Sequence, residues 1–360
     1  MTDATATPAG TAPSRRPTRR REVRLLGRLA NWLVSLLIGL AGLLLVTFSF
    51  THISSVDPVI RVVGDKASEA TYQAARHQLG LDRPLPEQFV LYVGRILHAD
   101  LGTSWSTGQP VASDLARAFP ATFELATVAI VIGAVLGVGL GLIAGLWPGG
   151  WRDSVVRVIS LLGYSVPIFW LGLMGLLLFY AKLDWVGGPG RMDVAYEYTL
   201  TSVSGLLLLD SARAGQWDAF RNLLSHLVLP ASLLGYVSLA YISRMTRSFM
   251  LNELSQEYIV AARAKGLSEA RIIWRHALRN AMVPLVTVIA LSYAGLLEGS
   301  VLTETVFAWP GLGLYITNAL QNADMNAVLG GTIVVGSVFI GLNLLSDVLY
   351  RTLDPRTRQR

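Results

Sequence analysis

The 360-residue chain is 52% apolar and 15% charged, contains no cysteine and carries a formal net charge of +6. A soluble globular protein has about 25% charged residues, so this composition excludes an ordinary soluble protein and indicates a membrane protein. The absence of cysteine excludes disulfides and thiolate metal sites. A nucleic-acid-binding protein needs its basic charge on a soluble domain, and the apolar blocks leave no room for one.

Residues 1–24 are rich in Thr, Ala, Pro and Arg and contain little that could pack into a core. This composition predicts a disordered basic tail in the cytoplasm. A cleaved signal peptide is the alternative, because basic residues precede an apolar run. The run at 29–50 is longer than the roughly 7–15 residues of a signal-peptide core. It also lacks a small-residue cleavage site, which favours an uncleaved membrane span.

Six apolar stretches are long enough to cross a bilayer, which takes about 20 helical residues. They lie at 27–50, 122–147, 154–181, 227–250, 281–305 and 327–350. Because lipid cannot satisfy exposed backbone groups, we predict an all-α fold with six transmembrane helices. In the second stretch, Gly137, Gly141 and Gly145 recur on one helix face. This spacing favours close helix packing over the general abundance of glycine in membrane helices.

Lys and Arg accumulate in short cytoplasmic loops and therefore predict the topology. Segments 1–26, 148–153, 251–280 and 351–360 are basic, whereas 306–326 has neither Lys nor Arg. We therefore expect both termini in the cytoplasm. The predicted parts are a disordered cytoplasmic tail (1–24), the first transmembrane helix with an extracytoplasmic segment (25–121), a five-helix membrane core that includes the cytoplasmic loop 251–280 (122–350), and a cytoplasmic C-terminal tail (351–360).

The extracytoplasmic segment 51–121 is too long for a simple turn. Two runs in it, 65–80 and 86–99, have helical spacing. Turn residues punctuate it at 82–84 and 108–110. We therefore expect a small helical cap rather than a separate domain.

The cytoplasmic loop 251–280 predicts a helix–turn–helix elbow. Ser255 is placed to cap a short helix that begins near Gln256, and Gly266 to end it in the left-handed conformation. Ser268 is placed to cap a second helix. A partner surface can approach the small residues of the first helix closely. From spacing alone, an amphipathic connector facing lipid headgroups is an equal alternative.

Basic residues follow the elbow on the second helix. Arg271, Arg275 and Arg279 lie at i, i+4 and i+8, and this spacing predicts one shared face. At the end of the fourth stretch, Arg244 and Arg247 are expected to snorkel to the headgroups.

The elbow resembles the EAA loop of ABC-importer permeases, in which two alanines are followed, after three residues, by a glycine. Ala261, Ala262 and Gly266 match this core. The chain departs from the pattern at Val260, where the family has Glu, and at Arg279, where it has Pro.

The strings at 262–268 and 275–281 are similar to the dipeptide, oligopeptide and nickel branch of these permeases. That branch departs from the EAA consensus in the same way. Further similar segments follow the order of the branch, and the resemblance spans residues 25–358. They are 79–84, 100–104, 165–172, 304–313 and 353–356.

The resemblance implies a type I ABC-importer permease with six membrane helices in the bacterial cytoplasmic (inner) membrane. It implies a second homologous permease subunit, two ABC ATPase subunits and an extracytoplasmic solute-binding protein as partners. ATP and Mg²⁺ would bind the ATPase subunits, and we expect this chain to hold no cofactor and to be no enzyme. In agreement, the sequence has no G-x-x-x-x-G-K-[ST] phosphate loop. The resemblance does not determine the solute, which can be a dipeptide, an oligopeptide, glutathione, a nickel chelate or a sugar.

By this resemblance, the elbow docks on the ATPase and transmits its work to the membrane helices. The expected coupling residues are Glu257, Tyr258, Ala261, Ala262, Arg263, Lys265, Gly266, Leu267, Arg275, His276 and Arg279.

Three residues are candidates for the pathway or its gating. Glu298 and Glu304 are ionisable groups in or beside the fifth stretch, where the default reading is functional. Glu298 equally fits a helix-pairing contact, and for Glu304 we favour an anchor next to Trp309. Pro167 is favoured as a tolerated kink over a hinge. The five histidines have no metal-ligand spacing, so no metal site is expected.

An ion-coupled secondary transporter or channel without ATPase subunits is the alternative function. Such proteins place charged groups at the membrane midplane in paired repeats, whereas the charges here cluster at the ends of the stretches. A membrane enzyme would need a convergent polar set, which the sequence does not contain.

Overall fold

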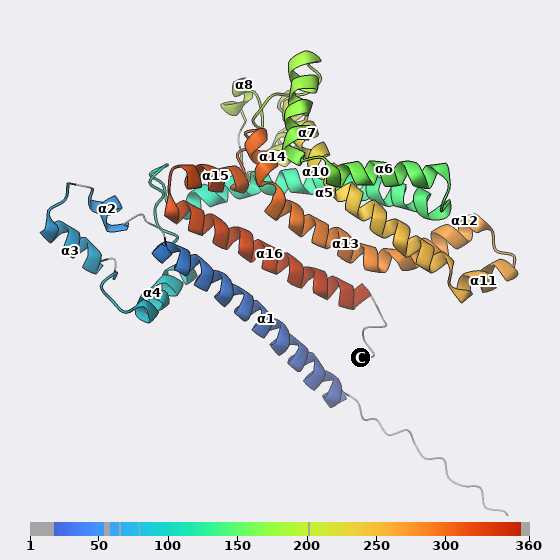
Figure 1. Ribbon diagram of the computed structural model, residues 1–360, viewed down its shortest axis with the longest axis horizontal. Helices are drawn as coiled ribbons and strands as arrows, with labels where there is room; N and C mark the ends of the chain where they lie inside the picture. The colour runs from blue at the N-terminus through green and yellow to red at the C-terminus, as the bar shows by residue number, and fades with distance from the viewer. Residues whose placement is uncertain (1–17, 54–57, 65, 79, 201, 354–360) are drawn as a thin grey trace, which may run out of the picture.

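A computed structural model of the chain describes residues 18–53, 58–64, 66–78, 80–200 and 202–353 (Figure 1). Within these ranges the secondary structure is helical apart from one isolated bridge, which confirms the all-α class. The elements in chain order are α1 (Thr18–Ile53), α2 (Pro58–Val63), α3 (Glu69–Gln78), α4 (Leu85–Leu97), α5 (Val111–Leu146), α6 (Trp151–Ser165), α7 (Ile168–Gly175), the π-helix η1 (Leu176–Lys182), α8 (Val194–Glu197), α9 (Leu207–Arg213), α10 (Trp217–Leu254), α11 (Glu257–Ala264), α12 (Glu269–Arg271), the π-helix η2 (Ile272–Ala277), α13 (Leu278–Gly299), α14 (Val301–Val306), α15 (Leu312–Gln321) and α16 (Met325–Leu353).

Within the described ranges, five helical segments are long and apolar enough to span a membrane: α1, α5, α10, the run from α12 to α13, and α16. The bent pair of α6 with α7 and η1 makes a sixth if it is counted as one span. The count of six and the side on which each terminus lies stay predictions. Figure 1 shows α11 and α12 at one end of the bundle and α15 at the other, and we call these the α11 end and the α15 end.

The third apolar stretch is broken rather than continuous. We expected one helix over 154–181 with a tolerated kink at Pro167, and this is wrong, because α6 and the α7–η1 pair meet at 98°. Proline has no N–H to donate and restricts the residue before it to extended backbone. Val166 accordingly has φ −95° and ψ 127°, and α7 starts afresh after Pro167.

The glycine spacing of the second stretch serves close packing of α5 against α10, as the sequence predicted. Gly137, Gly141 and Gly145 are all buried on the face toward α10. A Cβ added at Gly145 would lie 2.9 Å from the Cβ of Met250, and one at Gly141 would clash with the carbonyl oxygen of Ser243. The two helix backbones therefore touch, which is the small-residue packing typical of membrane helices.

The main core lies where α5, α10 and α13 meet. Leu125 and Ile242 are fully buried there, Leu234 is 2% exposed, and the indole of Trp309 joins them from the segment before α15. Apolar area removed from solvent stabilises such a cluster. Much of the outer surface of the long helices is exposed and apolar, as lipid-facing surface must be.

The segment between α1 and α5 is helical where spacing predicted helices. The runs at 65–80 and 86–99 correspond to α3 and α4, and α2 adds a short helix before them. Pro84 and Pro110 stand at the N-caps of α4 and α5, where the missing proline N–H costs no helical bond.

Three predicted boundaries differ from the structure. α1 begins at Thr18, so residues 18–24 continue the first helix instead of belonging to a disordered tail. α5 begins at Val111, so the end of the predicted extracytoplasmic segment is part of the second helix. α16 runs to Leu353. The remaining parts of the two predicted tails, 1–17 and 354–360, lie outside the described residues.

Candidate functional site

A short elbow made of α11 and α12 extends beyond the long helices (Figure 1). α10 ends at Leu254 and α11 begins at Glu257. We expected Ser255 to cap α11, and this is wrong, because its hydroxyl donates to the carbonyl oxygen of Asn252 at 2.8 Å. Gln256 occupies the N-cap position instead, without a side-chain capping bond. The turn is therefore held by the last carbonyls of α10.

Gly266 ends α11 in the left-handed conformation, as predicted. Its φ is +77°, a region that glycine enters without the steric cost of a Cβ. The N–H of Gly266 donates to Arg263 at 2.9 Å, and the N–H of Leu267 donates to Ala262 at 3.2 Å. These bonds satisfy the last carbonyls of the helix. Ser268 then takes the N-cap position of α12, as predicted, although its side chain makes no capping bond.

One face of α11 is packed on the bundle, and the opposite face is exposed. Ile259 is fully buried in a cluster with Met250 and Ile272. The exposed coupling candidates are Glu257, Tyr258, Ala261, Arg263, Lys265, Gly266, Arg275 and Arg279, and the half-buried ones are Ala262, Leu267 and His276. The elbow is thus anchored on its own helices while a small-residue surface faces outward.

Two polar contacts brace the elbow. Arg263 and Glu269 form an ion pair across the turn, with Nε–Oε1 at 2.8 Å and Nη2–Oε2 at 3.2 Å. Both side chains are exposed, so this pair contributes little to stability. The hydroxyl of Tyr258 accepts a hydrogen bond from Asn280 at 3.0 Å and donates to Glu253. Tyr258 therefore connects α11 to both α13 and α10.

The helix that follows the elbow is not a regular α-helix. η2 has i→i+5 bonding and more residues per turn than an α-helix. Residues four apart lie on nearly the same face in a π-helix as in an α-helix. All three arginines, Arg271, Arg275 and Arg279, are exposed, and their shared face stays a prediction.

The carboxylate of Glu304 is fully buried and holds the start of α15. Its Oε1 accepts hydrogen bonds from the hydroxyls of Thr122 at 2.7 Å and Ser300 at 2.8 Å. Its Oε2 accepts from the N–H groups of Gly313 at 2.7 Å and Leu314 at 3.1 Å. A helix N-terminus leaves N–H groups unpaired, and a carboxylate there is favourable. This geometry supports the anchoring role favoured for Glu304 over a pathway role.

Thr122 of α5 completes this cap. Its hydroxyl oxygen accepts the N–H of Leu312 at 2.8 Å, so the first three N–H groups of α15 all have partners. Nearby, the indole N–H of Trp309 donates to the carbonyl oxygen of Ala121 at 2.9 Å. The string at 304–313 therefore folds the segment between α14 and α15 back onto α5.

Glu298 has the opposite environment. Its side chain is exposed near the end of α13 and lines a narrow recess with Phe119, Leu312 and Phe339. The sequence left a pathway wall and a helix-pairing contact equally open for Glu298. Of the two acidic pathway candidates, Glu298 is exposed and Glu304 is fully buried.

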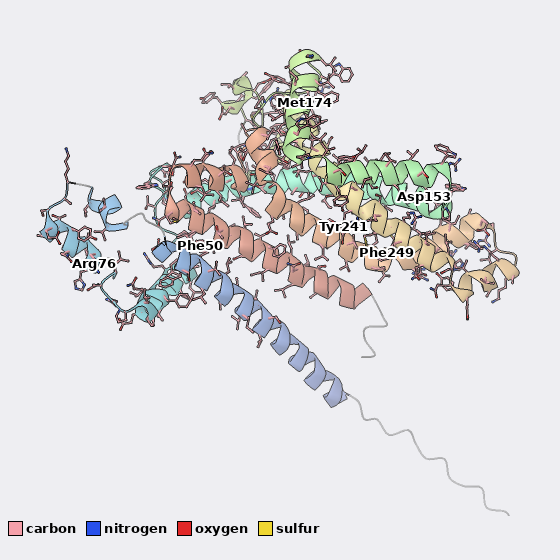
Figure 2. All side chains as sticks on the ribbon, viewed as in Figure 1. Phe50, Arg76, Asp153, Met174, Tyr241 and Phe249 are labelled. Carbon is pink, nitrogen blue, oxygen red and sulfur yellow. The ribbon has the colours of Figure 1, made fainter. Side chains whose placement is uncertain are left out.

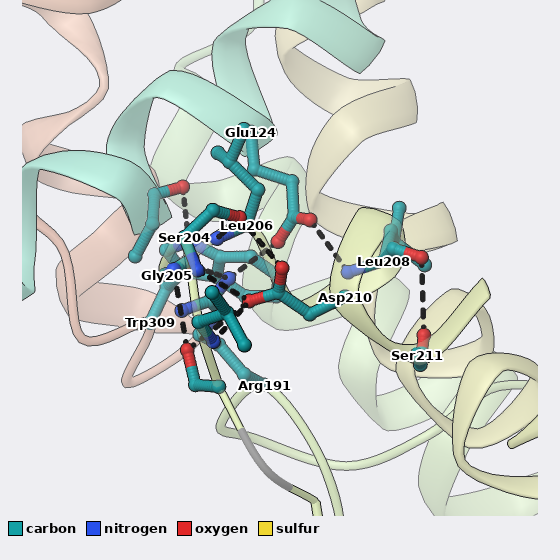
Figure 3. Close-up of polar contacts among 12 residues, drawn as sticks. Glu124, Arg191, Ser204, Gly205, Leu206, Leu208, Asp210, Ser211 and Trp309 are labelled. Carbon is teal, nitrogen blue, oxygen red and sulfur yellow. Dashed lines mark hydrogen bonds and ion pairs between the residues drawn. The ribbon is translucent and has the colours of Figure 1, made fainter. Parts of the chain in front are cut away.

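A buried ion pair that the sequence interpretation missed ties the segment after η1 to α5 (Figure 3). The guanidinium of Arg191 pairs with Glu124 and also donates to the carbonyl oxygen of Gly205 at 3.1 Å. The second carboxylate oxygen of Glu124 accepts the N–H of Leu208 at 2.8 Å. Arg191 also lies 5.6 Å from the ring centre of Trp309. The sequence signal for this ion pair was an acidic residue, Glu124, inside an apolar stretch.

Asp210 organises the loop before α9 in the same region (Figure 3). Its carboxylate accepts the N–H groups of Val203 and Ser204, each at 2.9 Å, and the hydroxyls of Ser204 at 2.7 Å and Ser202 at 3.3 Å. Burial alone would raise the pKa of Asp210, but these hydrogen bonds together hold it below its ordinary value.

A second missed ion pair lies toward the α11 end, where Figure 2 labels Asp153 on α6. Asp153 is 1% exposed and binds Arg247 of α10 through two bonds, Nε–Oδ1 at 2.7 Å and Nη2–Oδ2 at 2.9 Å. Arg157 approaches the same carboxylate only to 3.8 Å. The expectation that Arg247 snorkels is therefore wrong, and Arg244 stacks its guanidinium 4.9 Å from the ring centre of Tyr164.

The Asp-Leu-Gly-Thr-Ser string after α4 docks on the start of α16. The hydroxyl of Ser104 donates to Asp324 at 2.6 Å, and the other oxygen of that carboxylate accepts the N–H of Ala327 at 3.2 Å. Gly102 has φ +78°, and a Cβ there would lie 3.0 Å from the amide nitrogen of Asn326. The string thus has a structural role at the α15 end.

The contacts near both ends position helices and do not assemble a catalytic set. In the part of the chain that the structure describes, no group of three or more His, Asp or Glu could hold a metal ion. The outer face of α11 and the recess at Glu298 are exposed surfaces that hold predicted coupling and pathway residues.

Two family models match the chain. One, described as "Binding-protein-dependent transport system inner membrane component", matches residues 137–359, which include the elbow and Glu304. The other, described as "Binding-prot-dependent transport system membrane comp, N-term", matches residues 24–126. The chain belongs to this family. Its members' description agrees with the several apolar helices found here.

Among its relatives are permease proteins of peptide transport systems. The "Probable D,D-dipeptide transport system permease protein DdpB" of Escherichia coli is 43% identical over 89% of this chain and 94% of DdpB. The di/tripeptide permease DppB of Pseudomonas aeruginosa is 39% identical over 89% of this chain and 95% of that protein. A solved chain of the MetNI methionine ABC transporter, inward facing, is 18% identical, with a TM-score of 0.47 over 67% of this chain and 96% of that chain.

Proposed function

We propose that this chain is a membrane-spanning permease subunit of an ATP-driven importer for di- or oligopeptides or related small solutes. Family membership carries the proposal, since the peptide permeases of E. coli and P. aeruginosa match 89% of the chain at 39–43% identity. The exposed face of α11 adds a surface on which a partner can act, at the position of the EAA-like pattern.

In the proposed assembly, the chain pairs with a second, homologous permease subunit. Two ABC ATPase subunits bind ATP and Mg²⁺ in the cytoplasm, and an extracytoplasmic binding protein delivers the solute. The chain crosses the bacterial inner membrane with both termini and the elbow on the cytoplasmic side. It holds no cofactor and hydrolyses nothing itself.

The anchoring of the elbow suits it to transmit motion of the ATPase to the membrane helices. α11 is held to α10 and to the start of α13 by the buried side chain of Ile259 and by the hydrogen bonds of Tyr258. Close-packed interiors deform little and transmit strain. A displacement of a docked ATPase therefore moves the ends of α10 and α13 together.

A pair of matched proline substitutions tests the coupling role. Gly266 has φ +77° and donates to Arg263, and Gly215, far along the chain in the α9–α10 turn, has φ +69° and donates to Ala212. A Cβ at either glycine meets nothing within 4 Å. Both Gly→Pro changes impose the same backbone strain and lose the same kind of bond. We expect Gly266→Pro alone to lower solute-stimulated ATP hydrolysis and copurification of the ATPase, while insertion is retained.

Equal coupling in the two variants would contradict docking at the elbow. The same preparation separates the importer from an ion-coupled transporter. In proteoliposomes, we expect uptake to require ATP, the ATPase subunits and the binding protein. Ion-driven uptake by this chain without those partners would support the alternative function.

A further inference from the structure

Glu298 is an exposed ionisable side chain in a helix that is long and apolar enough to span a membrane. No hydrogen bond or ion pair reaches its carboxylate from the residues that the structure describes. Glu304, only six positions along the chain, has both carboxylate oxygens fully engaged. A carboxylate at such a position is costly against lipid, so the face that carries Glu298 meets water or another polar molecule.

The recess beside Glu298 is built from four elements of this chain. Phe119 and Thr122 come from α5, Leu312 from α15 and Phe339 from α16, and residues of α13 itself complete the lining. Apart from Glu298, the lining side chains are apolar, aromatic or hydroxyl-bearing, and none is ionisable. Charge is therefore the one strong feature by which this recess distinguishes one ligand group from another.

The approach to Glu298 along α13 is open. A Cβ added at Gly295, one turn before, or at Gly299, the next residue, would meet nothing within 4 Å. Leu291, two turns before Glu298 on the same face of α13, is 44% exposed. The carboxylate is thus reachable from the side, while the recess behind it is narrow and suits one small charged group rather than a whole peptide.

We propose that Glu298 receives the protonated amino terminus of the peptide as it passes the α15 end of the bundle. This inference rests on the proposed function and names the peptide group that the chain recognises. An ammonium group donates charge-assisted hydrogen bonds to a carboxylate, which are stronger than neutral ones. The apolar and aromatic lining beside it offers contact to the first side chain of the peptide without selecting among side chains.

A two-substrate comparison tests the proposal in the complete complex. ATP-driven uptake of dialanine and of N-acetyl-dialanine is measured in proteoliposomes and expressed per loaded binding protein. For Glu298→Gln, we expect dialanine uptake to fall about tenfold, whereas uptake of the acetylated peptide changes less than twofold. Glu298→Asp should keep most of the preference for the free amino group. Glu197→Gln, which removes an exposed carboxylate of α8, should leave both uptakes unchanged.

Equal losses for both peptides would overturn the proposal and would indicate that Glu298 pairs with a cation of the second permease subunit. Unchanged uptake of both would overturn it as well. Assembly of each variant is checked by copurification of the other subunits, and Glu298→Asp serves as the folded reference if Glu298→Gln fails to assemble. Wild-type complex that shows no ATP-driven uptake of dialanine, longer peptides or related solutes would contradict the proposed function itself, which separates the two failures.

Discussion

Thr122 and Glu304 lie 182 positions apart in the chain, and the hydroxyl of one donates to the carboxylate of the other at 2.7 Å. The same hydroxyl accepts the backbone N–H of Leu312. One threonine of α5 thus satisfies both an acidic side chain and the start of a distant helix. The α15 end of the bundle depends on this junction.

Replacing Thr122 by Val keeps the shape of the side chain and removes its hydrogen bonds. The N–H of Leu312 is then left buried without a partner, which costs about 1–3 kcal/mol. We expect Thr122→Val to lower the midpoint of thermal unfolding in detergent, and Thr122→Ser, which retains the hydroxyl, to restore most of it. Equal midpoints for the Val and Ser variants would show that the hydroxyl is dispensable.

Two glycines of α5 give a matched test of its packing on α10. A Cβ at Gly141 clashes with the backbone of Ser243, whereas one at Gly139 meets nothing within 4 Å. We expect Gly141→Ala to destabilise the protein by about 1–3 kcal/mol through overpacking. Gly139→Ala should be neutral or stabilising by up to about 1 kcal/mol, because alanine favours the helix. Similar unfolding midpoints for both variants would contradict the close contact.

Two arginines approach Asp153, and we expect them to stabilise the folded protein to different extents. Arg247 makes two short bonds to the buried carboxylate, so Arg247→Gln should cost about 2 kcal/mol of stability, less than for a fully buried pair because Arg247 is 27% exposed. Arg157 is 60% exposed and 3.8 Å away, so Arg157→Gln should cost less than about 0.5 kcal/mol. Chemical unfolding in detergent measures both, and a larger loss for Arg157→Gln would reverse the assignment.

Asp210 should make the loop before α9 sensitive to acid. Its hydrogen bonds hold its pKa below the ordinary value of 3.8. A depressed folded pKa stabilises the loop fully above the unfolded pKa, and this stabilisation is lost as the pH falls through the folded pKa. We expect pepsin cleavage within 202–206, relative to an unfolded reference peptide, to rise below pH 3.8 in the wild type.

The matching variant Asp210→Asn should show high cleavage across the same acidic range, because the amide cannot accept all of these bonds as a carboxylate does. Cleavage of the wild type that follows the reference peptide at every pH would show that titration of Asp210 does not loosen the loop.

Local sequence patterns predicted much of the fold. The stripe of Gly137, Gly141 and Gly145 predicted a close helix contact, and the position of Gly266 predicted a left-handed helix end, because both depend on residues near in sequence. The resemblance supplied the family. The right-angle break at Pro167 was underestimated, since a proline predicts a weak point but not the packing that sets the angle.

Contacts between segments far apart in the sequence could not be predicted from local patterns. Arg247 was assigned to lipid headgroups because its buried partner, Asp153, is 94 positions away in the chain. Glu124 was overlooked although an acidic residue in an apolar stretch is a readable signal. The π-helical turn η2 was also not predicted, since spacing rules assume 3.6 residues per turn.

The backbone contact between α5 and α10 limits how this bundle can rearrange. With Gly141 against Ser243 and Gly145 against Met250, a slide of one helix along the other would drive atoms into steric overlap before it had advanced one residue. The helices α5 and α10 therefore move together as one rigid body. Any rearrangement within the chain then takes place between this helix pair and its neighbours, such as α13 and α16.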